Sequence, residues 1–260
     1  PEAFAAVADG RPDVLIHEAA QIDVRVSVDQ PALDASINLV GFANLLAAAA
    51  AGRVTRVIFA SSGGVVYGDP AVLPTPEPTD TLPISPYGVS KLAGEHYLRV
   101  LGALHGFEGV ALRYSNVYGP RQDPASEAGV VSIFVSRLLA GKALTIFGDG
   151  KQTRDYVFVK DVARANLLAA SVAVSRGDRL DVPAFNVATG RETSVNDLAQ
   201  YIGRALGRHP VIEYAPPRAG ELFRSCLDVS KAARALGWAP THDFDAGLRE
   251  LAAWFEGPAT

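Results

Sequence analysis

Four short apolar runs, separated by longer helical or polar segments, constrain the fold of this chain more than any other feature. They cover residues 13–17, 56–60, 110–114 and 184–188. Each run is continuously apolar rather than alternating, which is typical of strands buried on both faces of a parallel sheet. Helical periodicity fills the segments between them, most clearly at 33–51 and 86–105. The pattern predicts an α/β fold with a doubly wound parallel sheet.

The composition changes in two later parts of the chain. Residues 121–150 are rich in turn-forming side chains, and residues 191–260 combine a Pro-rich segment with terminal helices. An apolar strand returns between them, near residue 185. We therefore predict two interleaved parts: a larger domain from 1–120 plus about 151–190, and a smaller lobe from about 121–150 plus 191–260.

Composition also limits the classes of function. A chain of 260 residues with 48% hydrophobic content can bury a substantial core, and its net charge of −4 offers no footprint for nucleic acid or a membrane. No apolar run approaches the roughly 18 residues of a membrane span. The single cysteine, Cys226, excludes an internal disulfide, and no Cys/His cluster has zinc spacing, so no metal is expected. We expect a cytoplasmic, soluble protein.

Tyr87 and Lys91 stand four residues apart at the start of the predicted helix 86–105. Ser85 suits the N-cap and Pro86 the first helical position, so both side chains would share one face of the first turns. At about 4 Å, an ammonium favours a neighbouring phenolate by roughly 4 kcal/mol, which would lower the pKa of Tyr87. A tyrosine of this kind is a usable proton acceptor near neutral pH. The alternative is an ordinary surface helix with a half-buried phenol and a solvated amine.

Polar side chains follow three of the predicted strands. They are His17 to Gln21, Ser61 to Gly64, and Tyr114 to Asn116. The carboxyl ends of parallel strands meet along one edge of a sheet, where ligands bind. Ser61 to Gly64 could equally be a simple turn, but it stands just before the Tyr87 helix.

Ser62, Tyr87 and Lys91 together resemble the Ser/Thr-Tyr-Lys set of the short-chain dehydrogenase/reductase superfamily. The segments 113–122, 148–157 and 185–190 (RYSNVYGPRQ, GDGKQTRDYV and FNVATG) extend the resemblance. They are similar to the extended branch of NAD-dependent epimerases and dehydratases, and most of all to the UDP-glucose (galactose) 4-epimerases. The resemblance covers essentially the whole chain.

The resemblance implies an NAD cofactor and a redox mechanism at carbon 4 of a nucleotide sugar. Tyr87 would take the proton of the 4-hydroxyl, Ser62 would hydrogen-bond the reacting oxygen, and Lys91 would hold the nicotinamide ribose and lower the pKa of Tyr87. Ser61 would be the fallback for the hydroxyl role. The further cofactor-binding positions implied are Ala19, Ala20, Asn38, Ser61 and Tyr114.

The resemblance also implies a substrate, a UDP-hexose such as UDP-glucose or UDP-galactose. Its binding positions would be Asn116, Arg154, Arg218, Glu221 and Ser225. Arginine suits a diphosphate because its planar fork makes bidentate, charge-assisted contacts. The alternative for Arg154 and Arg218 is a solvated surface arginine. A side chain as small as Ser225 would leave room for an N-acetyl group on the sugar.

Many relatives carry the hydroxyl residue at the position of Gly63, so the hydroxyl role shifts here to Ser62, and two further features bear on function. Gly63, Gly64 and Val65 stand where dehydratases and decarboxylases of the family carry carboxyl groups, which favours redox chemistry at carbon 4 alone. The glycine-rich turn that holds the NAD pyrophosphate is absent, and the chain has no methionine, so we expect a further segment ahead of residue 1.

Alternatives remain open at this point. They are a uronate 4-epimerase, a net reductase and a catalytically inactive nucleotide-binding protein. By resemblance, a homodimer is expected through the helices at about 34–51 and 86–105.

Overall fold

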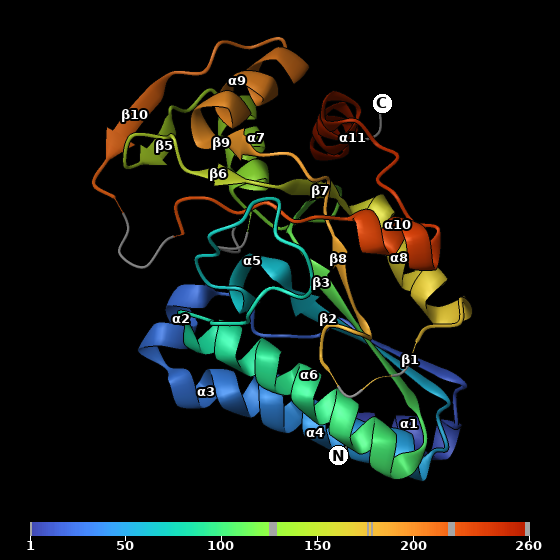
Figure 1. Ribbon diagram of the computed structural model, residues 1–260. Coiled ribbons are helices and arrows are strands. Elements are labelled where there is room, and N and C mark those ends of the chain that lie inside the picture. The colour runs from blue at the N-terminus through green and yellow to red at the C-terminus, as the bar shows by residue number, and fades with distance from the viewer. Residues whose placement is uncertain (1, 125–128, 176, 178, 218–221, 258–260) are drawn as a thin grey trace.

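The fold is organised around a four-stranded parallel sheet with strand order β1-β2-β3-β8 (Figure 1). The computed structural model describes residues 2–124, 129–175, 177, 179–217 and 222–257. The four strands are β1 (Val14–His17), β2 (Arg56–Ser62), β3 (Glu108–Tyr114) and β8 (Ala184–Val187). All three pairings are parallel, as the continuous apolar runs predict.

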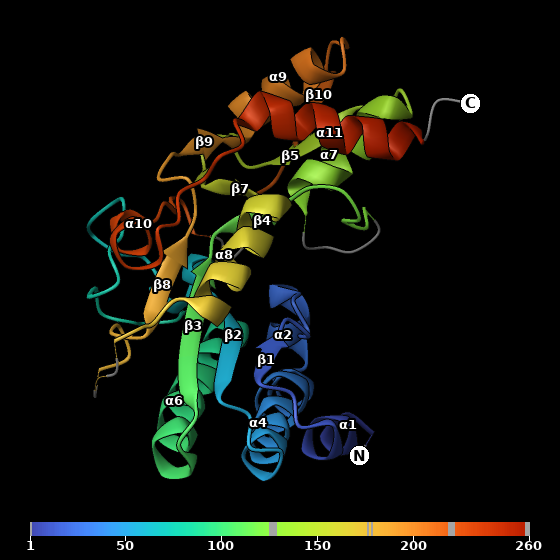
Figure 2. The ribbon, with the colours of Figure 1, turned by 90° about the vertical axis from the view of Figure 1, so that its right-hand side faces the viewer.

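Helices cover both faces of this sheet (Figures 1 and 2). One face carries α3 (Pro31–Ala35), η1 (Ser36–Val40), α4 (Gly41–Ala51) and α6 (Pro86–His105), with α1 (Glu2–Gly10) packed against α4. The other carries α8 (Val159–Ser171) and α10 (Ser230–Leu236). Side chains of β2 alternate between the two faces. Val57 and Phe59 pack in a core with residues of α4 and α6, and Ile58 packs in a core with residues of α8 and α10. The prediction of a doubly wound sheet is confirmed.

The helical stretch Pro31–Ala51 is long and apolar enough, by length and composition, to cross a membrane, with a mean hydropathy of 1.4. Its inner side supplies Phe42, Leu46 and Ala49 to the core beneath β2. A core helix of a globular domain has this same composition, because one of its faces must be apolar. Its middle turn, η1, is π-helical, a local widening that is frequent at functional sites.

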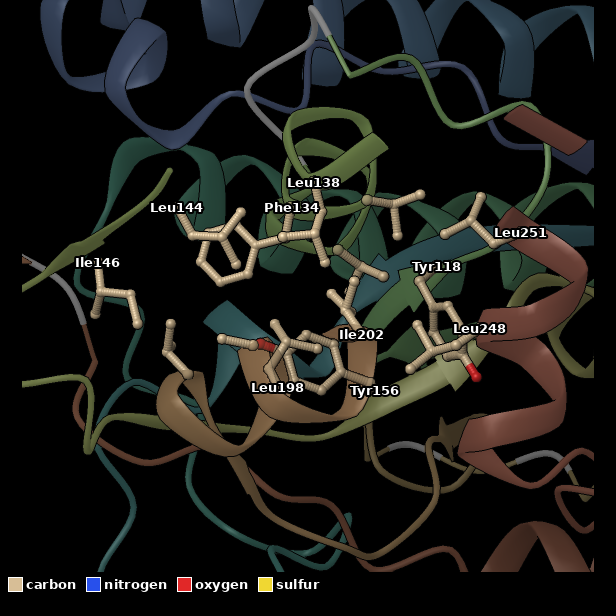
Figure 3. Packing of buried hydrophobic residues seen from close by; sticks show 14 of the residues in the cluster. Tyr118, Phe134, Leu138, Leu144, Ile146, Tyr156, Leu198, Ile202, Leu248 and Leu251 are labelled. Carbon is tan, nitrogen blue, oxygen red and sulfur yellow. The ribbon is translucent and has the colours of Figure 1, made fainter. Parts of the chain in front are cut away.

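A smaller lobe stands beyond the carboxyl ends of the strands. It contains the parallel pair β5 (Leu144–Phe147) and β10 (Ile212–Ala215), with the helices α7 (Val130–Leu139), α9 (Val195–Ala205) and α11 (Phe244–Glu256). Leucine, isoleucine and aromatic side chains from these elements interdigitate in a separate core of the smaller lobe, which also contains Tyr118 and Tyr156 (Figure 3).

Two short strand pairs lie between the sheet and the smaller lobe. They are β4 (Asn116–Tyr118) with β7 (Tyr156–Phe158), and β6 (Thr153–Arg154) with β9 (Thr193–Ser194). The predicted assignment of all of 191–260 to the smaller lobe is wrong for α10. Ala232, Leu236 and Trp238 pack against β-strand residues of the large sheet, because the apolar side of α10 faces α8 and β8.

Candidate active site

Helix α6 begins as predicted. The Ser85 hydroxyl caps it by accepting a hydrogen bond from the Gly88 backbone N–H at 3.2 Å, and Pro86 takes the first helical position. Tyr87 and Lys91 therefore share one face of the first turns. That face is turned inward, because Tyr87 is 9% exposed and Lys91 is 4% exposed. The alternative of a solvated amine on a surface helix is excluded.

Lys91 connects α6 to the end of β2. Its Nζ donates to the carbonyl oxygen of Ala60 at 2.8 Å. The same nitrogen lies 5.7 Å from the ring centroid of Tyr87 and 5.1 Å from that of Phe59. An ammonium has three protons, so Lys91 keeps donors for a ligand after the Ala60 contact is made.

Burial dominates the ionisation of this pair. It lowers the pKa of Lys91 to about 8, against the attraction of Glu18 and Asp34. Burial also raises the pKa of Tyr87 above its ordinary value, and the negative charge of Asp34 raises it further. The predicted net lowering of the Tyr87 pKa is therefore wrong for the chain by itself. Desolvation of the phenolate, with the charge of Asp34, sets the direction of this shift.

Ser61 and Ser62 point to different surroundings, because successive side chains of a strand alternate. The Ser61 hydroxyl donates to Glu95 Oε1 at 2.5 Å. The Ser62 hydroxyl has no hydrogen-bond partner among the described residues, and Ser62 stands at the N-cap of α5 (Gly63–Val66). The fallback hydroxyl role for Ser61 is wrong, since that group is committed to Glu95. The cofactor contact predicted for Ser61 stays a prediction.

Glu95 belongs to a buried ion pair that the sequence analysis did not identify. Arg113 Nη2 lies 2.7 Å from Glu95 Oε2, and Arg113 Nε donates to Glu95 Oε1 at 3.0 Å. Arg113 Nη1 also donates to the Tyr67 hydroxyl at 2.8 Å. Both charged side chains are at most 2% exposed. Glu95 follows Lys91 by four residues, so helical spacing was the one available signal.

Asn38 lies in the π-helical turn and holds the loop after β1. Its Nδ2 donates to the Gln21 carbonyl at 2.8 Å, and its Oδ1 accepts from the Gln21 N–H at 2.8 Å. That loop contains Ala19 and Ala20. The two predicted cofactor segments are thus brought together by one amide side chain. Direct contact of Asn38, Ala19 or Ala20 with a cofactor stays a prediction.

Asp34 is a second acidic residue that the sequence analysis did not identify. Its carboxylate is fully buried and accepts from Ser90 Oγ at 2.6 Å, Asn38 Nδ2 at 2.8 Å and Gln21 Nε2 at 3.1 Å. Asp34 precedes Asn38 by one helical turn, which is the only sequence signal for the pairing.

His17 ends β1 and Tyr114 ends β3, the two strands on either side of β2. The Tyr114 hydroxyl donates to Glu18 Oε1 at 2.9 Å and accepts from Asn166 Nδ2 at 2.7 Å. Burial, with Glu18, raises its pKa well above the ordinary value. The His17 ring stacks on Phe42 at 4.8 Å, and burial, aided by Lys91, lowers its pKa to about 4. A neutral, stacked His17 is suited to packing at the end of β1.

The comparisons with known proteins agree with this geometry. A model of the NAD-dependent epimerase/dehydratase family matches residues 2–188. The chain belongs to this family. A curated relative, the putative UDP-glucose 4-epimerase of Methanocaldococcus jannaschii, is 45% identical over 244 residues, which are 94% of this chain and 77% of the relative.

Solved structures of family members superpose closely on the chain. UDP-glucose 4-epimerase of Thermotoga maritima, with UDP-glucose, has a TM-score of 0.91 at 43% identity, covering 98% of this chain and 81% of its own. The enzyme of Thermus thermophilus, with NAD, has a TM-score of 0.90 at 41% identity, covering 99% and 82%. UDP-N-acetylglucosamine 4-epimerase of Methanobrevibacter ruminantium, with UDP-N-acetylmuramic acid, has a TM-score of 0.89 at 34% identity, covering 98% and 80%.

The residues of this family member fit an NAD cofactor along the sheet edge. Lys91 has unused donors there, and the Ser62 hydroxyl is open. Ser115 Oγ, next to Tyr114, is buried without a hydrogen-bond partner in the described chain. An unpartnered buried hydroxyl at the end of a strand suits a site that a polar ligand completes. The described residues include no group of His, Cys, Asp and Glu that could hold a metal ion.

The predicted substrate positions are brought only partly together. Asn116 begins β4, and its backbone N–H donates to the Asp155 carbonyl at 2.9 Å. Arg154 lies in β6 and donates from Nη1 to the Thr153 carbonyl at 2.8 Å. Ser225 is buried. Arg218 and Glu221 lie outside the described residues, so their roles stay predictions.

Asp155 ties this part of the site together. Its carboxylate accepts from the Thr189 and Gly190 backbone N–H groups, each at 2.8 Å, and from the Leu227 N–H at 3.4 Å. Asp155 thereby holds together the segments that carry Asn116, Arg154 and Ser225.

Proposed function

We propose that this chain interconverts the epimers at carbon 4 of a UDP-hexose, with NAD as the resident redox cofactor. One observation carries the proposal. Lys91 Nζ is held between the Tyr87 ring and the Ala60 carbonyl, two residues before the open hydroxyl of Ser62. A phenol, an ammonium and a hydroxyl at the carboxyl edge of a parallel sheet suit proton transfer to and from a sugar hydroxyl.

The chain's own groups handle the proton. NAD, when bound, accepts the hydride from carbon 4 and returns it. Tyr87 Oη takes the proton of the 4-hydroxyl as that hydroxyl becomes a carbonyl, and gives it back when the carbonyl is reduced. Lys91 stabilises the phenolate by its charge, and Ser62 donates to the reacting oxygen. No proton or electron is lost over the cycle, so the reaction is an isomerisation.

The neighbourhood of Gly63 disfavours dehydration and decarboxylation. Gly63, Gly64 and Val65 provide no carboxyl group beside the reacting centre. A side chain at Gly63 would also collide, since its Cβ would lie 2.4 Å from Leu227 Cδ1. Elimination needs an acid and a base that this turn cannot supply.

A panel of UDP-sugars, incubated with the protein and read by NMR, tests the proposal. We expect scrambling of carbon 4 without net consumption of added NAD or NADH. Net consumption of NADH would indicate the rival reductase, and turnover of uronates alone would indicate a uronate 4-epimerase. If carbon 4 is scrambled in none of the sugars, the remaining hypothesis is a catalytically inactive nucleotide-binding protein.

The proposed substrate range includes N-acetylated sugars, because Ser225 is small, buried and followed directly by Cys226 and Leu227, which contact the Asp155 carboxylate. The related UDP-N-acetylglucosamine 4-epimerase supports this extension. Turnover of UDP-N-acetylglucosamine should accompany that of UDP-glucose, and Ser225→Tyr should selectively remove the former. Equal loss of both activities would contradict a role in the choice of sugar.

A homodimer is proposed through the outer sides of the helical stretch 31–51 and of α6. These adjacent helices expose apolar side chains at helical spacing: Leu33, Ile37 and Val40 on the first, and Val89, Tyr97, Val100 and Leu104 on α6. A paired stripe of this kind fits a second copy of itself in an isologous interface. Sedimentation should give twice the chain mass, and Leu104→Glu should shift it toward the monomer.

The cytoplasm is the proposed location, since a lone, buried thiol needs no oxidising compartment. Cell fractionation with activity assays would test it. Activity recovered mainly with membranes would contradict it.

A further inference from the structure

Asp34 is a buried carboxylate without a cation. It is 0% exposed, and its three hydrogen-bond donors are the neutral side chains of Ser90, Asn38 and Gln21. Among the described residues, no lysine, arginine or histidine lies within 4.0 Å of it. An ionised carboxylate in such surroundings costs stability, so an apolar or amide side chain would serve packing better.

The place of Asp34 links it to the reacting groups. Ser90, its partner at 2.6 Å, stands on α6 between Tyr87 and Lys91. Its other two partners belong to the π-helical turn and to the loop after β1. A single carboxylate therefore joins three separate segments that line the sheet edge beside Tyr87 and Lys91.

We propose that Asp34 is a positioning residue that fixes α6 against the loop after β1 and sets a negative charge beside the Tyr87–Lys91 pair. The inference rests on the proposed epimerase function. It assigns Asp34 no contact with the substrate.

The charged and titratable groups around Tyr87 and Lys91 determine in which direction Asp34 shifts their pKa values. Lys91 and Tyr87 face Asp34 from α6, and Glu18 and His17 approach Lys91 from the end of β1. A negative charge disfavours a phenolate and favours an ammonium, so Asp34 raises the pKa of both Tyr87 and Lys91. Removing it should lower both pKa values.

The pH profile of kcat for Asp34→Asn tests the proposal in the NAD-loaded protein. An amide can still bond all three partners, because the Ser90 hydroxyl can rotate to accept. We expect both limbs of the profile to move to lower pH, by roughly one pH unit. Ser90→Ala, the matched control, keeps the charge and should lower the plateau without moving the limbs. Limbs of Asp34→Asn that superimpose on the wild type would overturn the proposal.

A second measurement does not depend on turnover. Phenolate absorbance is titrated in the wild type and in Tyr87→Phe, and again in both proteins carrying Asp34→Asn. The difference between each pair reports Tyr87 alone, and it should titrate at lower pH without Asp34. Asp34→Ser replaces Asp34→Asn if the latter fails to fold. Absence of epimerase activity in the wild type would refute the proposed function, whereas an unmoved Tyr87 titration would refute the role of Asp34.

Discussion

Two acidic networks beside α6 solve the problem of a buried carboxylate in different ways. Glu95 is paired with Arg113 through two short contacts, so its charge is cancelled where it stands. Asp34 is bonded only by neutral groups, so its field reaches the neighbouring Tyr87 and Lys91. The first arrangement locks a helix to two strands. The second leaves an uncancelled charge beside the proposed reacting groups. We therefore assign the Glu95 network to the stability of the fold and the Asp34 network to the function of the site.

The largest expected effect comes from Tyr87→Phe, which removes the proposed base that Asp34 faces. We expect kcat to fall by roughly 10²- to 10⁴-fold, the usual contribution of a positioned acid–base group. The midpoint of urea unfolding should change little, because a phenyl ring fills the same space. Tyr214→Phe is the control, since Tyr214 is exposed on β10 and should keep full activity. A Tyr87→Phe protein with wild-type kcat would contradict the role of Tyr87 as the base, and with it the proposed action of Asp34 on that base.

Arg113→Met should cause the largest loss of stability, because it leaves Glu95 buried and unpaired. Breaking such a pair costs about 3–5 kcal/mol in the free energy of unfolding. Urea denaturation measures it. Arg224→Met removes an exposed pair with Glu192 and should leave the unfolding midpoint where it is. Equal midpoints for the two variants would mean that burial of the Glu95 pair has no structural role.

Lys91 should impose a pH dependence on stability. Its pKa is about 8 in the folded chain against 10.5 for an ordinary lysine, so the unfolded chain holds this proton to higher pH. The contribution of Lys91 to the free energy of unfolding should therefore rise between about pH 8 and 10.5, by roughly 3 kcal/mol. Urea unfolding of wild type and Lys91→Met across this range isolates that rise. Parallel curves for the two proteins would contradict the burial of a charged Lys91.

Asp34→Asn should have the smallest effect on stability, which sharpens the contrast with Arg113→Met. It removes a charge that has no partner, and the amide keeps the hydrogen bonds. We expect the free energy of unfolding to change by less than about 1 kcal/mol. A loss as large as that of Arg113→Met would show that Asp34, too, is mainly a structural group.

The sheet and the Tyr87 helix could be predicted because their signals are local. Continuous apolar runs identify the strands, and Ser85 with Pro86 identifies the start of α6. The side of α6 that carries Tyr87 and Lys91 follows from their spacing of four. The depth at which that side is buried does not follow from spacing, and for this reason the predicted pKa shift of Tyr87 had the wrong sign.

The two networks could not be predicted, because each depends on partners far away in the chain. Ser90 stands 56 residues from Asp34, and Ser61 stands 34 residues from Glu95. On a helix, an acidic residue normally indicates a solvated face. Only the packing of α3, α6 and β2 against one another turns these two inward. Likewise, α10 has an ordinary amphipathic pattern that does not specify which lobe it covers.

The chain passes more than once between the core of the large sheet and the core of the smaller lobe, and this limits how it can be divided. One core takes Tyr118 and Tyr156 together with α11 near the C-terminus, and the other takes α8 and Trp238 from between them. A gene cut at any point between residues 118 and 238 would therefore give two fragments, neither of which encodes the whole of either core. Fragments co-expressed from such a cut could recover the fold only by reassembling across it, so the two lobes are expected to be inherited and exchanged as one unit.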